Sequence, residues 1–402
     1  MMADLLFLAH RIPFPPDRGD KIRSFHELRH LAGLGRVHLA CFADDAADAA
    51  HLAGLRAALG GALGEAHVEV RRTSRAVAGA RALIAGKPAS LTLFDSRAIR
   101  AFVEQLLASR DIDTIFAFSG QMAQFVPATT RARFVMDFGD VDSAKFEAYG
   151  VAGGLLAAVH RREGERLAAF ERAIAARADV SLFVSEAEAA LFRRRSGLRD
   201  ADIRALQNGV DLDYFAPRPS PGHPLSPGPL IVFTGQMDYA PNIDAVRWFA
   251  DEVMPLLPQA RFAIVGRHPA GAVRRLAGPR TVVTGAVDDV RAWLAAADVV
   301  AAPLRIARGI QNKVLEAMAM ARPVIASPAG FEGIEAEPGR DLLVADGAEA
   351  QAEAIMRLLD DPARARAIGA AARRRMLEAY RWEARLAPLA GIVGRGPRRA
   401  AA

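Results

Sequence analysis

The chain has 402 residues, 51% of them hydrophobic and 24% charged, which is the composition of an ordinary globular protein with enough length for two domains. Its formal net charge of +6 at pH 7 favours anionic partners, but charge does not choose among sugar nucleotides, phospholipid head groups and nucleic acid. The single Cys41 excludes an internal disulfide and favours the cytoplasm, and no apolar stretch approaches the roughly 18 residues of a membrane span.

Apolar strand-like runs alternate with amphipathic helical stretches through the first half of the chain. This alternation indicates a mainly parallel sheet covered by helices on both faces. We therefore predict an α/β, doubly wound, Rossmann-like domain over residues 1–216. Its predicted strands are Leu5–Ala9, Val37–Ala43, Val68–Arg71, Thr114–Phe118, Phe134–Met136 and Val180–Val184, and its predicted helices include Lys21–Leu34, Ser96–Ser109 and Ala157–Ala176.

A charged loop follows the first predicted strand and leads into a helix. It contains Gly19, Asp20, Lys21 and Arg23. Gly19 can bring backbone N–H groups near a phosphate, and the two cations add positive charge. We predict an acceptor or phosphate loop here, with an ordinary surface loop before a capped helix as the alternative.

Three carboxylates, Asp137, Asp140 and Asp142, stand directly after the predicted strand Phe134–Met136. Charges at the carboxyl end of a strand need a partner or solvent, so a functional role is favoured over packing. The spacing of Asp140 and Asp142 also resembles a metal-binding pair, but two carboxylates alone are a weak metal signal. We predict no metal. Basic and aromatic residues are not interleaved, so nucleic acid is not a predicted partner.

A segment rich in Pro and Gly, residues 217–229, is predicted to be a linker. After it, the alternation restarts and predicts a second Rossmann-like domain over residues 230–378, with a C-terminal helix and tail over 379–402 that returns to the first domain. Two such domains joined by a hinge are expected to face a ligand cleft. The predicted strands are Leu230–Thr234, Phe262–Val265, Thr281–Thr284, Val299–Ala302 and Pro323–Ala326, and the predicted helices are Asn242–Val253, Asp288–Ala296, Gln311–Met320 and Ala348–Leu359.

Glycines follow three predicted strands of the second domain. In a parallel sheet ligands bind outside the carboxyl ends of strands, and a glycine there lets the backbone approach a ligand closely. Each glycine taken singly is more readily explained by a turn. No G-x-G-x-x-G follows a strand and no P-loop motif is present, which argues against a dehydrogenase and a P-loop NTPase. The candidate donor-binding residues in these loops are Gly235, Gln236, Asn242, Gly266, Ala286 and Val287.

The segment from Gln311 to Ala326 carries the strongest functional signal. It reads as a polar loop, a short helix with Glu316 in its first turns, an Arg-Pro pair and a buried strand. The positive end of a helix suits a diphosphate, and a nearby carboxylate can accept hydrogen bonds from ribose hydroxyls. The pattern favours a nucleotide-sugar donor, and an ordinary helix-to-strand connection is the alternative.

Several motifs occur in an order and spacing that resemble the family 4 glycosyltransferases of the GT-B fold. Within that family the chain is most similar to the sugar transferases associated with exosortase and PEP-CTERM exopolysaccharide loci. The general motifs are Val184–Glu188, Gln207–Phe215, Gly235, Val265-Gly266, Gly285–Val287 and Leu315–Met318, and the narrower ones are Phe118–Gln124, Asp137–Lys145, Arg308–Lys313 and Trp382-Glu383.

The resemblance implies a GT-B enzyme with a nucleotide-sugar donor on the C-terminal domain and a glycan or polyprenyl-linked acceptor on the N-terminal domain. It implies retaining transfer without a metal or other cofactor. Together with the charge and the missing membrane span, it predicts a cytoplasmic protein, with peripheral contact to the anionic inner face of the cell membrane left open. A sugar-nucleotide 2-epimerase and a non-catalytic scaffold of a polysaccharide assembly are the alternatives.

Two positions depart from the family pattern. Arg308 stands eight residues before Glu316, where members carry a first Glu, and Gln236 and Met237 replace an Arg and a Lys. We therefore predict that Arg308 and Lys313 supply the charge for the diphosphate and that Glu316 meets the ribose. We also predict that Asp140 or Asp142 acts as base on the acceptor hydroxyl. The remaining predicted donor contacts are Gly309, Ile310, Gln311, Asn312 and Leu315.

Overall fold

The computed structural model describes residues 4–151, 153, 156–220, 228–307 and 309–394, and the chain divides into two compact units. Unit 1 comprises Met1–Gln207 with Leu386–Ala402, and unit 2 comprises Asn208–Arg385. The predicted linker falls mainly on residues 221–227, outside the described residues.

The break between the units lies ahead of the Pro-rich segment because the residues after Gln207 pack on unit 2. The N–H of Val210 donates to the carbonyl of Tyr380 over 2.7 Å, and Arg373 Nη2 donates to the carbonyl of Leu212 over 3.1 Å. The side chain of Leu212 is buried in the core of unit 2. Local sequence patterning does not reveal which of two cores a short apolar segment joins.

Unit 1 is built on a seven-stranded sheet in the order β3-β2-β1-β4-β5-β6-β7, with all strand pairs parallel. Its inner strands are almost wholly buried, as parallel strands covered on both faces must be. The strands are β1 (Asp4–Ala9), β2 (Val37–Ala43), β3 (Leu63–Val70), β4 (Ile112–Phe118), β5 (Arg133–Gly139), β6 (Val180–Phe183) and β7 (Ile203–Ala205). The α-helices are α1 (Gly19–Ala32), α2 (Ala46–Ala50), α3 (Leu52–Leu59), α4 (Arg75–Ala85), α5 (Ala89–Leu93), α6 (Arg97–Ser109), α7 (Asp142–Val151), α8 (Ala157–Arg177), α9 (Glu186–Ser196) and α18 (Pro388–Val393).

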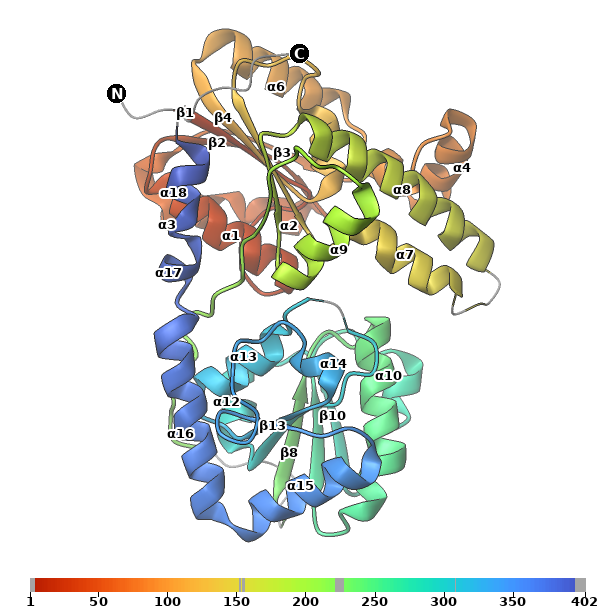
Figure 1. Ribbon diagram of the computed structural model, residues 1–402, viewed down its shortest axis with the longest axis vertical. Coiled ribbons are helices and arrows are strands. Elements are labelled where there is room, and N and C mark those ends of the chain that lie inside the picture. Colours follow the sequence, from red (N-terminus) through yellow and green to blue (C-terminus); the bar gives the residue numbers. More distant parts are fainter. Residues whose placement is uncertain (1–3, 152, 154–155, 221–227, 308, 395–402) are drawn as a thin grey trace. The chain divides into compact units, whose positions relative to one another are not determined.

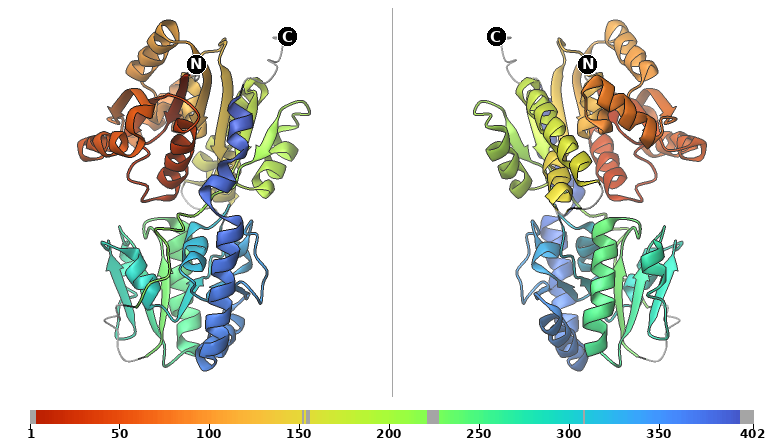
Figure 2. Two further views of the ribbon diagram at one scale, coloured as in Figure 1. Left: turned by 90° about the vertical axis from the view of Figure 1, so that its left-hand side faces the viewer. Right: turned by 90° about the vertical axis from the view of Figure 1, so that its right-hand side faces the viewer.

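Helices cover both faces of this sheet, as Figure 2 shows. Residues of α6, α8 and α9 join Leu6 and Leu8 of β1 in one apolar cluster. The alternate residues Leu5 and Phe7 face the other side, because successive side chains of a strand point to opposite faces, and α1 contacts β1 and β2. The C-terminal α18 also belongs to unit 1, where it contacts β5.

Unit 2 has a six-stranded parallel sheet in the order β10-β9-β8-β11-β12-β13. Figure 1 shows α12, α13 and α16 on one side of it and α10 on the other, where α15 also packs. The strands are β8 (Leu230–Thr234), β9 (Arg261–Val265), β10 (Thr281–Gly285), β11 (Val299–Ala302), β12 (Val324–Ala326) and β13 (Leu343–Val344). The α-helices are α10 (Ala240–Trp248), α11 (Gly271–Arg274), α12 (Val290–Ala296), α13 (Asn312–Ala319), α14 (Pro328–Phe331), α15 (Ala348–Asp360), α16 (Pro362–Ala379) and α17 (Trp382–Leu386), the last of which ends at the boundary with unit 1.

Both sheets reverse their strand order at a central point, between β1 and β4 in unit 1 and between β8 and β11 in unit 2. At such a point the flanking connections leave for opposite faces of the sheet, so a crevice forms outside the carboxyl ends of the two strands. The predicted pair of doubly wound, Rossmann-like domains is confirmed. The topology also indicates where each domain can bind a ligand.

The structure differs from the predicted elements in a few places. The helix predicted over Asn242–Val253 is α10 followed by a π turn, Phe249–Val253, and a 3-10 turn, Met254–Leu256. The regular helix ends at Trp248, and Pro255 lies in the 3-10 turn, where its nitrogen has no hydrogen to donate to a continued α-helix. The sequence does not predict β7 or β13, which have three and two residues.

Candidate functional site

The first turn of α13 brings a lysine to the first turn of α10, the helix that follows β8. Lys313 Nζ donates to Asn242 Oδ1 over 2.6 Å and lies 4.7 Å from the centre of the Phe233 ring. Asn242 is 4% exposed and is held by its own Nδ2, which donates to the carbonyl of Gln236 over 2.9 Å. Two segments predicted separately to bind the donor therefore meet at the switch point of the unit 2 sheet.

Burial shifts the pKa of both charged groups on α13. Desolvation lowers the pKa of Lys313 to about 8, against the opposing effect of Glu316. Desolvation likewise raises the pKa of Glu316 to about 7, against the opposing effect of Lys313. The two residues are three positions apart, so they lie on the same side of the helix. Shifts toward neutral pH are typical of groups that act on a ligand.

The N-terminus of α13 offers backbone donors beside this lysine. The helix begins at Asn312, and the preceding Gln311 provides no side-chain cap. The first N–H groups of any α-helix have no partner within the helix, and the helix dipole makes that end positive. Asn312 is positioned by Asn208 Nδ2, which donates to its Oδ1 over 3.3 Å. Such an end combined with Lys313 suits a diphosphate, and that contact stays a prediction.

Some predicted donor-binding residues lie in the core. Leu315 is fully buried in an apolar cluster of unit 2, and Ile310 is 8% exposed in the same cluster. The Leu315 side chain is therefore unavailable to a ligand, and a contact of the donor with this residue stays a prediction. Gly309 lies in the loop before α13, and Arg308 lies outside the described residues.

The end of β10 presents the other predicted contacts. Gly285 ends this strand with φ 69°, in the left-handed region, and a Cβ there would meet no atom within 4 Å. Ala286 follows and is exposed, and Val287 is partly buried. These two residues therefore remain accessible for the predicted contact with a nucleotide.

Gly235 and Gly266 are required by the close approach of two loops. A Cβ on Gly266 would lie 1.6 Å from the carbonyl oxygen of Gly235. The N–H of Gly235 is already used, donating to the carbonyl of Val265 over 3.0 Å. The missing side chain of Gly266 thus lets the backbones after β8 and β9 cross, and a Cβ on Gly235 would lie 2.7 Å from Asn242 Nδ2. The contact of both glycines with a donor stays a prediction.

We expect Gly266→Ala to destabilise unit 2 by about 3 kcal/mol or more, since overpacking a fixed backbone contact costs about 1–3 kcal/mol and occasionally more. Urea denaturation followed by circular dichroism measures the effect. Gly79→Ala in α4 is the matched control, because a Cβ there meets nothing within 4 Å. That variant should be as stable as the parent or up to about 1 kcal/mol more stable, since alanine favours helices over glycine. Equal unfolding curves for the Gly266 variant and the parent would contradict the packing argument.

A cavity of about 410 Å³ lies elsewhere in unit 2. Its lining includes Trp248, Arg305, Ser327 and Gln351, and none of the described residues predicted to bind the donor borders it. Cavity size therefore does not coincide with the predicted donor residues.

In unit 1, two glutamates from distant helices cap the start of α7. Glu188 Oε2 on α9 accepts from the N–H of Val141 over 2.7 Å. Glu171 on α8 accepts from the N–H and the hydroxyl of Ser143, over 3.0 and 2.6 Å. Both glutamates are buried. They accept hydrogen bonds from backbone N–H groups that have no partner within the helix. The sequence around α7 does not reveal these caps, because both glutamates come from distant helices.

Burial shifts the pKa of both aspartates predicted as base candidates, and one of the capping glutamates adds to the shift of Asp140. Burial raises the pKa of Asp140 to about 7, and the negative charges of Glu188 and Asp142 add to the shift. Burial also raises the pKa of Asp142, against the opposing charge of Lys145. A carboxyl group that titrates near neutral pH is suited to general base catalysis. The assignment of either aspartate to the acceptor hydroxyl stays a prediction.

The two cations predicted for the phosphate loop are turned inward. Lys21 is 5% exposed and its Nζ donates to Asp48 Oδ1 over 2.5 Å. Arg23 is 3% exposed, and its Nε and Nη2 donate to Asp137 Oδ2 over 2.9 and 2.6 Å. Both cationic side chains are thus buried and hydrogen-bonded to carboxylates of the protein itself. Arg23 and Asp137 form a structural ion pair across the sheet edge rather than a phosphate contact.

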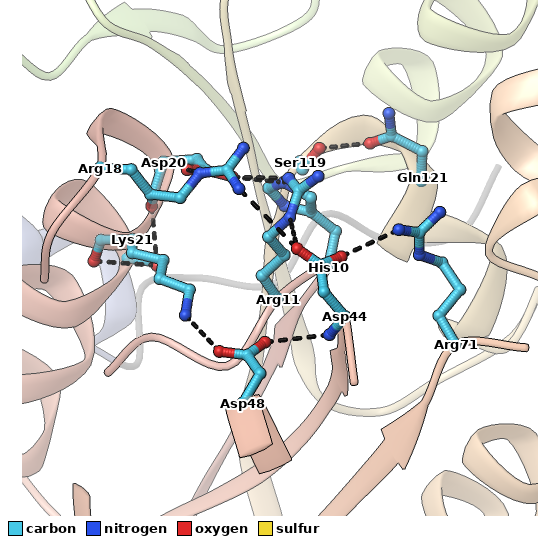
Figure 3. A network of polar contacts seen from close by, with 11 residues as sticks. His10, Arg11, Arg18, Asp20, Lys21, Asp44, Asp48, Arg71, Ser119 and Gln121 are labelled. Atoms are coloured by element: carbon cyan, nitrogen blue, oxygen red, sulfur yellow. Dashed lines mark hydrogen bonds and ion pairs between the residues drawn. The ribbon is translucent and has the colours of Figure 1, made fainter. Parts of the chain in front are cut away.

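Sequence reasoning missed the cations that do reach solvent at this edge. Arg11, Arg71 and Asp44 lie together there with Asp20 of the predicted loop (Figure 3). The sequence did contain one signal for this site. Arg71 ends the predicted strand Val68–Arg71, and a charged residue at the carboxyl end of a parallel strand is a candidate ligand-binding residue.

Other kinds of site find little support in the described part of the chain. Within it, no group of three or more His, Cys, Asp or Glu side chains is placed to hold a metal ion. The described helices also include none with the length and apolar character needed to cross a bilayer.

Comparison with known proteins gives two family matches and several relatives. Residues 65–209 match the glycosyl transferase 4-like domain, and residues 228–361 match the glycosyl transferases group 1 domain. Over 238 residues the chain is 30% identical to the GDP-mannose-dependent alpha-(1-6)-phosphatidylinositol monomannoside mannosyltransferase of Mycolicibacterium smegmatis. That match covers 54% of this chain and 62% of the relative's length.

Solved structures share the fold over nearly the full length. Sucrose-phosphate synthase from Thermosynechococcus elongatus superposes with a TM-score of 0.73 at 19% identity, covering 97% of this chain and 98% of the other. Anabaena HepE in complex with UDP-glucose superposes with a TM-score of 0.68 at 16% identity, covering 97% and 99%. With a glycosyl transferase 4-like domain ahead of a group 1 domain on two doubly wound sheets, the chain belongs to the GT-B glycosyltransferases.

Proposed function

We propose that this glycosyltransferase moves a sugar from a nucleotide-sugar donor to a hydroxyl of a glycan or lipid-linked acceptor. The observation that carries the proposal is the contact of Lys313 with Asn242 beside the open N-terminus of α13. A cation and a positive helix end at the switch point of a parallel sheet suit the departing diphosphate of such a donor. Stabilising that leaving group in a closed site is the main catalytic contribution we propose.

The donor proposal starts from two sugar nucleotides. The mycobacterial relative is named as GDP-mannose-dependent, and Anabaena HepE was solved with UDP-glucose. We therefore propose GDP-mannose and UDP-glucose as the first donors to test. Glu316, held near the diphosphate end of α13, would meet the ribose.

The finer parts of the function rest on the sequence resemblance. The narrower motifs, among them Phe118–Gln124 and Trp382-Glu383, support a place in exopolysaccharide biosynthesis at exosortase-associated loci. We further propose that transfer retains the anomeric configuration and needs no metal. Proton NMR of the product's anomeric signal tests whether the anomeric configuration is retained. Turnover after exhaustive chelation with EDTA tests whether transfer needs a metal.

The function is tested by thermal shift and turnover on the full chain. A ligand that binds only the folded state raises the melting temperature by mass action, so a true donor should do so where the free sugar does not. Incubation with donor alone, and then with donor and a lipid extract, separates the candidate activities. Release of nucleotide diphosphate only with acceptor supports transfer. Epimer formed from donor alone would instead favour a 2-epimerase, and binding without any turnover would favour a scaffold.

We also propose where unit 1 contacts an anionic membrane. Leu83 and Ile84 on α4 are 66% and 89% exposed, and Val159 on α8 is 58% exposed. Arg162 Nη2 of α8 donates to the carbonyl of Ala82 over 3.1 Å, which joins the two helices into one surface. Residues 71–87 contain five basic and no acidic side chains. Apolar tips beside positive charge suit an anionic bilayer, and the proposed location is the inner face of the cell membrane.

Changing both Leu83 and Ile84 to aspartate is expected to weaken binding to phosphatidylglycerol vesicles by at least about tenfold, since burying each side chain is worth about 1.5–3 kcal/mol. Co-sedimentation measures the bound fraction. Leu256→Asp is the control, because that residue is 42% exposed but lies in unit 2. Unchanged sedimentation of the double variant would contradict the surface we propose.

A further inference from the structure

A second cluster of charges lies at the carboxyl ends of the three strands on one side of the unit 1 switch point. We call Arg11, Arg18 and Arg71 the arginine cluster; they surround Asp20 and Asp44 (Figure 3). Asp44 directly follows β2 and Arg71 directly follows β3, while Arg11 comes two residues after β1. Because β1, β2 and β3 are neighbours in the sheet, these loops meet at one edge.

The two carboxylates hold the guanidinium groups in place. Arg11 Nη1 donates to Asp20 Oδ2 over 2.7 Å, and its Nε donates to Asp44 Oδ2 over 3.3 Å. Arg71 Nη2 donates to Asp44 Oδ1 over 2.9 Å. Arg18 Nε lies 2.8 Å from Asp20 Oδ1. Side chains fixed in this way lose little further freedom when they bind a ligand.

The cluster keeps an excess of positive charge. It has three guanidinium groups and two carboxylates. Burial opposes ionisation of both aspartates, but contact with His10, Arg11 and Arg18 lowers the pKa of Asp20, and Arg11 and Arg71 lower the pKa of Asp44, so both stay ionised at neutral pH. Lys21 and Asp48 beside it neutralise each other over 2.5 Å. The edge therefore carries a net charge of about +1 before any ligand binds, counting each arginine as always protonated.

Hydrogen-bond donors also outnumber acceptors here. Each guanidinium has five N–H donors, whereas each carboxylate offers about four lone-pair sites. Arg71 Nε is buried and has no partner among the described residues. The side chains of Arg11, Arg18 and Arg71 are 21%, 30% and 22% exposed, so a ligand can reach them. Planar forks of this kind match the oxygens of a phosphate or diphosphate.

We propose that the arginine cluster binds a phosphate group of the acceptor, so that the acceptor is a phosphate ester or diphosphate ester. This inference rests on the proposed function, because the predicted donor residues lie in unit 2 and leave unit 1 to the acceptor. The chain also runs from Arg71 through Arg72 into α4, whose exposed Leu83 and Ile84 form the proposed membrane surface. A phosphate bound at the cluster would thus lie on the same segment that meets the lipid.

The direct test titrates inorganic pyrophosphate and glycerol 3-phosphate into the full chain saturated with UDP or GDP, followed by ³¹P NMR. Arg71→Gln should weaken both probes by about tenfold or more, the usual size of a charge-assisted hydrogen-bond contribution. Arg72→Gln is the matched control, because it removes the same charge from the adjacent exposed position. Equal losses in the two variants would overturn the proposal, since they would reflect only general electrostatic attraction.

A double variant separates geometry from net charge. Arg71→Gln combined with Asp44→Asn removes one charge of each sign, so it keeps the net charge of the cluster. We expect it to bind the probes as weakly as Arg71→Gln alone. Recovery to the parent's affinity would show that charge alone attracts the anion and would also overturn the proposal. The melting temperature with nucleotide sugar should not change in either variant, which shows that both fold.

The source of the phosphate is decided by comparing vesicles with soluble esters. For a lipid-linked acceptor, Arg71→Gln should weaken binding to phosphatidylinositol vesicles more than to phosphatidylcholine vesicles. For a soluble sugar phosphate, glucose 1-phosphate binding should fall while vesicle binding is unchanged. If the parent binds nucleotide sugar but none of these phosphate probes, the arginine cluster is purely structural and the proposed function stands.

Discussion

Lys313→Met is expected to lower kcat/KM by about 10²–10³, the loss typical of removing one group that stabilises developing negative charge. Methionine keeps an unbranched side chain of similar size but removes the cation that lies beside Asn242 and over the Phe233 ring. Because the lost interaction is with the diphosphate, nucleotide diphosphate should bind more weakly while a nucleoside without phosphates binds as before. Initial rates and thermal shifts with the donor measure both effects.

Lys87→Met is the matched control for this prediction, because Lys87 is exposed in unit 1 and has no part in the donor site. It should leave the binding of nucleotide diphosphate and nucleotide sugar unchanged. Lys313→Arg keeps the charge in a bulkier form and should recover part of the loss. If Lys313→Met turned over donor at the parent's rate, the assignment of the diphosphate to α13 would have to be abandoned.

The pH profile gives an independent signature of the same site. Lys313 has a pKa lowered to about 8, so its cation is lost as the pH rises through that value. Glu316 has a pKa raised to about 7, so its carboxylate is lost as the pH falls through that value. We expect kcat/KM to peak between these limits and its basic limb to disappear in Lys313→Met, since this ratio reports groups of the free enzyme.

Asp140→Asn is expected to lower kcat by about 10²–10⁴, the range of a general base contribution. The pKa of Asp140 is raised to about 7, so the base form grows as the pH rises through neutrality. Donor affinity should not change, because Asp140 lies in unit 1 and the predicted donor residues lie in unit 2. Single-turnover rates with saturating donor and acceptor separate this chemical step from binding.

Asp142→Asn distinguishes the two base candidates. If Asp140 is the base, removing the negative charge of Asp142 should lower the pKa of Asp140, because that charge is one cause of its rise. The acidic limb of the profile then moves to lower pH with little loss of maximal rate. A collapse of rate in Asp142→Asn alone would transfer the base assignment to Asp142, and full rates in both variants would refute it for either.

The strands show what local sequence can predict. The strands Val37–Ala43, Leu230–Thr234 and Val299–Ala302 have the bounds predicted from sequence. Each is a continuous apolar run that both faces of a parallel sheet bury, so the signal is strong and local. The division between the units could not be predicted in the same way, because Val210 and Leu212 join unit 2 through contacts with residues far along the chain.

The sequence by itself determined the alternating elements, the strand-end loops and the motif around Lys313 and Glu316, because these depend on neighbours within a few turns. Tertiary structure decided which charges are available. Arg23 is bound to Asp137, 114 positions away, and Asn242 receives Lys313 from 71 positions away. Burial and the energy of an ion pair depend on such distant partners, so a charge that looks free in the sequence can be structural in the fold.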